Sequence, residues 1–173
     1  MMRPNEMTYF EEQQPIRKWV KYIVYSALSL EMLAMLFFYY AGTQKIPIGG
    51  EVPETEGLTA AVLITAGVLA LMVWMFNKFS LTTFITQKGI YAQFVPFKVH
   101  FIPKEQITDV HIGAFPVFER GSYGVGYSIR NGKVFSMGTK EGIFVHLQNG
   151  KKYIISTADS QNAQKAIDKI KIY

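Results

Sequence analysis

The pattern of hydrophobic and polar residues changes once along the chain, near Lys78. Before that point lie two long apolar runs, WVKYIVYSALSLEMLAMLFFYYA at residues 19–41 and LTAAVLITAGVLALMVWMF at residues 58–76. After it come short stretches of alternating apolar and polar residues, separated by Gly, Pro and Asn. Long unbroken runs are typical of helices that cross a membrane, and short alternating stretches are typical of β-strands. We therefore predict a membrane α-helical hairpin followed by a mainly β domain.

Both apolar runs are long enough to cross a hydrocarbon core of roughly 30 Å. From Val20 on, the first run holds only Lys21 and Glu31 as charged residues, and the second run holds none. A cleaved signal peptide is the alternative for the first run. Its apolar core is longer than the usual stretch of about 7–15 residues, however, and it ends in bulky FFYY. We expect two uncleaved spans, at about residues 19–41 and 58–77.

The basic residues around the two runs predict their orientation. Arg17, Lys18 and Lys21 flank the start of the first run, and Lys78 and Lys88 follow the second. The loop at residues 42–57 holds one Lys and three Glu. Because loops rich in Lys and Arg stay in the cytoplasm, this loop is expected outside, with both chain ends in the cytoplasm. The sequence thus predicts a multi-pass protein of the cell inner membrane, with a cytoplasmic segment at 1–18, a hairpin at 19–77 and a cytoplasmic domain at 79–173.

The second half of the chain reads as β-strands and one final helix. Gly89 and two Asn-Gly pairs, at residues 131–132 and 149–150, predict three hairpins. Asp159 or Ser160 can cap a helix whose apolar stripe is formed by Ala163, Ala166, Ile167 and Ile170. We predict about seven strands in a barrel or sandwich, with the helix covering one end. Eight runs are candidates for these strands, at residues 81–86, 90–95, 99–102, 107–112, 126–130, 133–138, 143–148 and 151–157.

The stretch RGSYGVGYSIRNG, at residues 120–132, is rich in glycine. A dinucleotide-binding loop needs the order G-x-G-x-x-G and a helix directly after it. Here the order is G-x-x-G-x-G, and a strand and an Asn-Gly hairpin follow. Gly121, Gly124 and Gly126 are therefore interpreted as structural glycines that permit positive φ or close approach of the backbone.

The run from Phe115 to Thr157 resembles the pleckstrin-homology-like domain of bacterial membrane proteins. The matching motifs are G-[YW]-x-I-R at residues 126–130, G-x-x-x-G-[IV] at 138–143 and G-K-K-x-x-I-x-T at 150–157. The resemblance extends over about residues 80–170, although Tyr123 and Tyr127 stand where the family often has Trp. It implies a seven-stranded β module with a C-terminal helix, usually non-enzymatic and often preceded by membrane spans.

Glu31 is the one residue that suggests chemistry inside the membrane, because it lies near the middle of the first run. A charged carboxylate there costs several kcal/mol unless it is protonated, paired or next to water. It can serve a proton- or cation-coupled site. It can also be a neutral Glu that hydrogen-bonds Ser29, Thr65 or another subunit. No second charge that would form a relay lies within the two spans, which favours the structural interpretation.

No other constellation predicts catalysis, a metal or a cofactor. The chain has no cysteine, and its histidines, His100, His111 and His146, show no zinc-binding spacing. The serines lie in no nucleophile motif, and the acidic residues of the second half form no catalytic pair. The basic residues are spread through hairpin turns without a helix to read bases, so we expect no nucleic-acid partner.

Residues 79–173 hold twelve Lys or Arg and six Asp or Glu. Such a basic domain is attracted to anionic lipids, with Lys78, Lys88 and Lys98 as possible headgroup contacts. We expect a non-enzymatic, membrane-anchored interaction or scaffold module. Its partners are the bilayer and another protein or a second copy, without a small-molecule substrate. The alternatives are an anionic-lipid-sensing domain, and a small transporter or enzyme subunit that uses Glu31.

Overall fold

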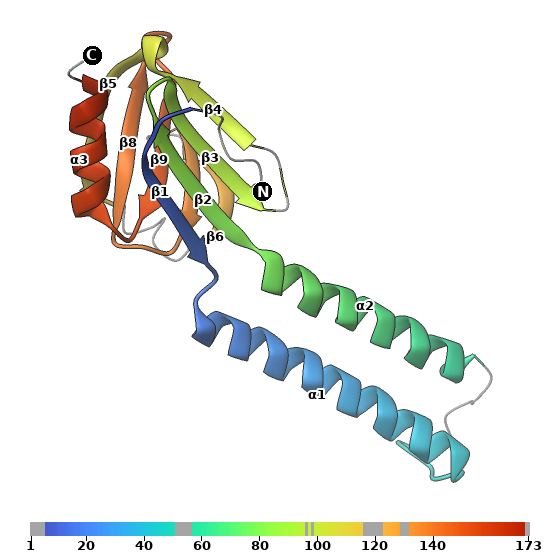
Figure 1. Cartoon of the computed structure of the whole chain (residues 1–173). Helices are drawn as coiled ribbons and strands as arrows, with labels where there is room; N and C mark the ends of the chain where they lie inside the picture. The colour runs from blue at the N-terminus through green and yellow to red at the C-terminus, as the bar shows by residue number, and fades with distance from the viewer. Residues whose placement is uncertain are drawn as a thin grey trace. The chain divides into compact units, whose positions relative to one another are not determined.

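A computed structural model describes residues 6–50, 57–95, 97, 99–115, 123–128 and 132–171. The chain divides into two compact units (Figure 1). Residues 17–77 form the helical unit, and the residues up to Ile16 join those from Lys78 onward in the β unit. The β unit is therefore discontinuous in sequence.

The helical unit consists of two helices, α1 (Lys18–Thr43) and α2 (Leu58–Lys78). Both are long and apolar enough to cross a membrane, and the most apolar stretch of each has none of its residues buried. A helix from the core of a water-soluble protein would bury that surface. The two helices predicted from the apolar runs are thus confirmed, with bounds shifted by one or two residues.

Polar contacts join the two helices at one end. The Asn77 side-chain oxygen accepts hydrogen bonds from the Tyr25 hydroxyl (2.9 Å) and the Lys21 ammonium (3.3 Å). Farther along, Ala66 and Ala70 line a shallow hollow that Ser29 and Met32 also line. Ala66 and Ala70 of α2 therefore face α1, as small residues do where helices pack closely.

The β unit begins with a strand that the sequence analysis did not predict, β1 (Thr8–Pro15). It pairs antiparallel with β2 (Ser80–Thr86), and Pro15 lies opposite Ser80. Phe10 and, just after the strand, Ile16 are buried. Residues 1–18 are predicted from the sequence to be a segment separate from the β domain. In the structure, part of this segment is an edge strand of the β unit.

The strands form two sheets of four and five strands, in the orders β1-β2-β3-β4 and β5-β8-β9-β7-β6. Neighbouring strands are antiparallel except for β7 and β9, which are parallel. Within the described residues there are nine strands in two open sheets, so the expected count of about seven was too low and no closed barrel forms. The remaining elements are β3 (Gly89–Val95), β4 (Val99–Pro103), η1 (Lys104–Gln106), β5 (Ile107–Ala114), β6 (Tyr123–Ser128), β7 (Gly132–Met137), β8 (Glu141–Leu147), β9 (Lys152–Thr157) and α3 (Ser160–Lys171).

Side chains from both sheets and from α3 fill the core. The four apolar residues predicted to face the core from the last helix are all at most 4% exposed. Asp159 caps α3, because its carboxylate accepts a hydrogen bond from the backbone N–H of Asn162 (3.2 Å). The helix packs against β5, β8 and β1 (Figure 1). The fully buried side chains include Phe84, Ile85, Ile90, Phe135, Ile143, Ile155 and Ile167.

Polar contacts, two of them buried, tie β1 to the other sheet at β9 and the residue after it. The Gln14 amide donates to the Ser156 carbonyl (2.7 Å) and accepts from the Ser156 hydroxyl (3.0 Å). The Glu12 carboxylate accepts from the Thr157 hydroxyl (2.7 Å) and the Ala158 N–H (2.8 Å). Because buried polar groups are costly when unpaired, these bonds make β1 an integral part of the β unit.

The β6–β7 hairpin depends on one glycine in particular. Gly132 has φ +73°, and a Cβ placed there would lie 2.2 Å from the Lys152 carbonyl oxygen. Gly124 also has positive φ, +114°. Gly126 has an ordinary φ and nothing within 4 Å of a Cβ, so the structure gives no geometric reason for glycine there. Gly121, the third structural glycine expected from the sequence, lies outside the described residues.

Candidate functional site

Three lysines surround an open hollow of about 520 Å³ at one end of the five-stranded sheet. The parallel pairing of β7 with β9 brings them together, because it sets Lys133 opposite Tyr153. We call this feature the lysine hollow. Its described lining residues are Tyr127, Gly132, Lys133, Asn149, Gly150, Lys151, Lys152 and Tyr153.

The turn between β8 and β9 fixes the backbone of two of these lysines. Gly150 has φ +78°, as expected for the second residue of an Asn-Gly turn. The Asn149 side-chain oxygen accepts from the Lys151 N–H (3.0 Å), and the Leu147 N–H donates to the Lys151 carbonyl (2.9 Å). The close approach of Gly132 to Lys152 then holds the start of β7 against this turn.

The lysine hollow is electrostatically positive. Its described lining residues include three Lys and no Asp or Glu. Burial lowers the pKa of His100, and the charges of Lys133 and Lys151 lower it further. The His100 ring stacks on Phe135 (5.6 Å between centroids), and its Nε2 has no hydrogen-bond partner among the described residues. The positive potential therefore reaches the contact between the two sheets.

The arrangement suits the binding of an anion. Each ammonium group offers three N–H donors and a full positive charge on a flexible stem. Tyr127, which is 81% exposed, adds a phenol at the rim of the hollow. An open, flexible set of cations of this kind holds carboxylates or phosphates without selecting one rigid geometry.

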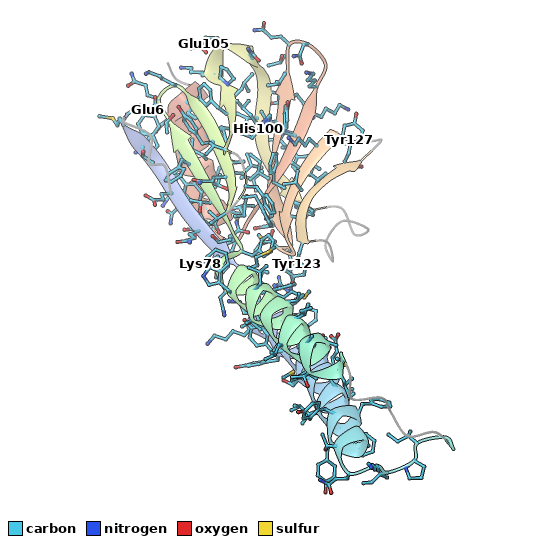
Figure 2. The ribbon with its side chains drawn as sticks, turned by 90° about the vertical axis from the view of Figure 1, so that its right-hand side faces the viewer. Glu6, Lys78, His100, Glu105, Tyr123 and Tyr127 are labelled. Atoms are coloured by element: carbon cyan, nitrogen blue, oxygen red, sulfur yellow. The ribbon has the colours of Figure 1, made fainter. Side chains whose placement is uncertain are left out.

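The lysine hollow lies at the end of the β unit opposite the connections to the helices. Its β8–β9 turn is held to η1, because the Gln148 side chain donates to the Glu105 carbonyl (2.8 Å). The connections to the helices are at Pro15 and Ser80, which pair with each other at the other end of the four-stranded sheet. In Figure 2, Lys78 and Tyr123 lie at one end of the β unit and Glu105 at the other.

Of the three lysines predicted to contact lipid headgroups, the structure describes Lys78 and Lys88, which lie apart. Lys78 ends α2, whereas Lys88 lies in the β2–β3 turn at the other end of β2. Seven strand residues separate them by about 20 Å. The Lys88 ammonium is 4.0 Å from the Glu6 carboxylate, and Lys98 lies outside the described residues.

Glu31 is exposed on α1. Its carboxylate makes no hydrogen bond or ion pair with the described residues, Ser29 and Thr65 included, and a bond to another subunit stays a prediction. The hollow between the helices is lined by Ser29 and Met32, and Glu31 is not among its lining residues. Within the described part of the chain, nothing pairs with this carboxylate.

The structure brings two histidines together that the sequence did not pair. The His111 ring stacks on Phe144 and lies 5.9 Å from the His146 ring, and the Asp109 carboxylate is 2.7 Å from His111 Nδ1. Across the described residues, no group of three His, Cys, Asp or Glu is arranged to hold a metal ion. We assign this cluster no ligand.

In the sequence, the lysines of the hollow are scattered over hairpin turns. The two Asn-Gly turns do show in the sequence, but the pairing of β7 with β9 does not, because these strands are not consecutive. A run of basic residues next to an Asn-Gly turn is the only sequence signal that pointed here.

No family model matches the chain, and the comparisons with curated proteins and with solved structures find no match. The resemblance to pleckstrin-homology-like domains stays a prediction.

Proposed function

We propose that this protein is a membrane-anchored, non-enzymatic interaction module that binds an acidic segment of a partner protein in its lysine hollow. The observation that carries the proposal is the position of the hollow. Three lysines converge at the end of the β unit that is opposite both helix connections.

Two features support the membrane anchor and its orientation. The apolar stretches of α1 and α2 are unburied, and lipid would cover them. The Lys and Arg residues that flank the hairpin favour the cytoplasm of a bacterial cell for both chain ends, with the anchor in the inner membrane. Two open sheets and a C-terminal helix are compatible with a pleckstrin-homology-like module, which we retain as part of the proposal.

The orientation has a direct test. We expect a reporter enzyme that is active only outside the cytoplasm to work when it is inserted in residues 42–57. It should be inactive when it is fused after Tyr173, because the Lys and Arg bias keeps that end inside. Reporter activity in cells measures both. Activity at the C-terminal fusion and none in the loop would reverse the proposed orientation.

The geometry favours a protein partner over the two alternatives. A headgroup-binding site is expected near the helix connections, where the bilayer surface would lie, but the lysines converge at the other end. A proton- or cation-coupled function of Glu31 needs a partner group. Among the described residues, Glu31 has none.

The binding prediction uses the full chain in phosphatidylcholine nanodiscs and a fluorescent hexaglutamate peptide. We expect the double substitution Lys151→Glu and Lys152→Glu to weaken peptide binding about tenfold, because exposed ion pairs contribute roughly 0.2–1 kcal/mol each. Fluorescence anisotropy measures the affinity.

The bound peptide should also raise the pKa of His100, since its carboxylates offset the charges of Lys133 and Lys151. The imidazole resonance in NMR reports this shift.

A charge-matched control separates the hollow from the net charge. Lys140→Glu and Lys165→Glu change the charge equally at exposed positions outside the hollow, so their effect should be small. An equal loss of affinity in both double variants would show that only net charge matters, and the hollow would lose its role.

Binding to vesicles that contain phosphatidylserine tests the lipid-sensing alternative. If they bind through Lys151 and Lys152 while the peptide does not bind, the lipid-sensing alternative replaces the proposal.

A further inference from the structure

Three phenylalanines gather in the β unit at Phe79, the first residue after α2 in the chain. The ring centroids of Phe79 and Phe94 are 5.6 Å apart, those of Phe79 and Phe97 are 5.7 Å apart, and those of Phe94 and Phe97 are 6.2 Å apart. We call them the aromatic cluster. Phe94 is buried, whereas Phe97 is 57% exposed.

Local backbone geometry brings Phe97 back to this end. Phe94 is the penultimate residue of β3, and the next residue, Val95, lies opposite Ser80 at the start of β2. The chain then turns, because the Phe97 N–H donates to the Phe94 carbonyl (2.6 Å). The Phe97 ring is thereby placed against Phe79, the residue that directly follows α2.

The residues at the end of α2 have the composition of a membrane–water interface. Trp74 is 56% exposed, Asn77 accepts hydrogen bonds from α1, and Lys78 ends the helix. Aromatic rings and Lys side chains are enriched at the level of the lipid headgroups. Phe79 is the next residue, so chain continuity keeps it close to that level, and the ring of Phe97 lies beside it.

We propose that Phe97 inserts into the headgroup region of the bilayer and gives the β unit a contact with the lipid in addition to its two chain connections. The inference rests on the proposed membrane anchor. A single exposed apolar residue is common on protein surfaces. Phe97 differs because its ring packs on a residue that adjoins an apolar helix whose surface is unburied.

Depth-dependent quenching of tryptophan tests the contact. The full chain carries Trp19 and Trp74 only, so Trp19→Phe with Trp74→Phe gives a background without tryptophan. Phe97→Trp is added to this background, and the protein is reconstituted in phosphatidylcholine vesicles that contain lipids brominated at different acyl positions. We expect bromines near the headgroups to quench the emission of this indole by at least half.

Tyr127→Trp in the same background is the matched control. Tyr127 is 81% exposed on the rim of the lysine hollow, so its replacement should be quenched little by any of the lipids. Equal quenching of the two indoles would overturn the proposal, because contact with lipid would then not be specific to the aromatic cluster.

A third variant distinguishes a missing Phe97–lipid contact from a failure of the helices to insert into the membrane. The chain with Trp19→Phe alone keeps Trp74 in α2 as a reporter of membrane insertion. If Trp74 is quenched and the indole of Phe97→Trp is not, the inference is wrong and the anchor stands. If Trp74 is not quenched either, the membrane anchor itself is refuted and the inference falls with it.

Discussion

A fragment that begins at Phe79 is expected to lack a cooperative thermal transition. The fragment holds eight of the nine described strands and α3, but it lacks β1. The buried side chains of Phe10 and Ile16 would be lost, and losses of this kind cost about 2–5 kcal/mol each. The Ser156 and Thr157 hydroxyls would lose their hydrogen bonds to β1, at roughly 0.5–1.5 kcal/mol for each bond. The sum approaches the whole stability of a typical domain, about 5–15 kcal/mol.

The matched control replaces the helical unit by a short linker. Because Pro15 lies opposite Ser80, a few Gly and Ser residues are enough to join residues 6–16 to residues 78–173 in a hairpin. Circular dichroism during heating should show a cooperative transition for the joined protein and a gradual change for the fragment. Equal melting temperatures in the two proteins would mean that β1 does not belong to the folding unit.

Replacement of Gly132 by valine is expected to lower the melting temperature of the joined protein by about 10 °C or more. A positive φ of +73° costs a branched residue roughly 1–3 kcal/mol. The new Cβ would also lie 2.2 Å from the Lys152 carbonyl oxygen, so the β7–β9 pairing must shift. One kcal/mol corresponds to about 4–8 °C in a domain of this size.

Gly126→Val is the control for this prediction. It places the same side chain on β6, the other strand of the hairpin, where φ is ordinary and nothing lies within 4 Å of the Cβ. Its cost should stay within about 0.5 kcal/mol, as for other surface substitutions. If Gly126→Val is the more damaging change, the register of the β6–β7 hairpin is wrong. Peptide binding by the two variants then tests whether the β7–β9 contact also maintains the lysine hollow.

The sequence predicted the elements whose formation depends on local chemistry. Both membrane-type helices were found, because no break interrupts their apolar runs. The strands after Lys78 were found because Gly and Asn-Gly turns separate them, and each turn connects strands that pair directly. The stripe of the last helix was found because Ala163, Ala166, Ile167 and Ile170 recur at helical spacing, and all four are buried.

The features that were missed depend on pairing between distant parts of the chain. β1 reads TYFEEQQP, in which four polar residues follow one another. Apolar and polar residues therefore do not alternate as they do in a typical strand. Its Gln14 and Glu12 are satisfied by Ser156 and Thr157, more than 140 residues later. The lysine hollow was missed for the same reason, since Lys133 meets Lys152 only through the parallel pairing of β7 and β9.

The discontinuous β unit also constrains synthesis and membrane crossing. β1 leaves the ribosome first and waits for its partner β2, which follows after the whole helical unit. At about 5–20 residues per second the delay is roughly 3–13 seconds. The two strands can pair only if both emerge on the same side of any membrane that the helices cross. A chain with only one helix inserted would leave β1 and β2 on opposite sides and an unpaired edge on the β unit. Completion of the four-stranded sheet therefore requires that the two helices cross the membrane together or not at all.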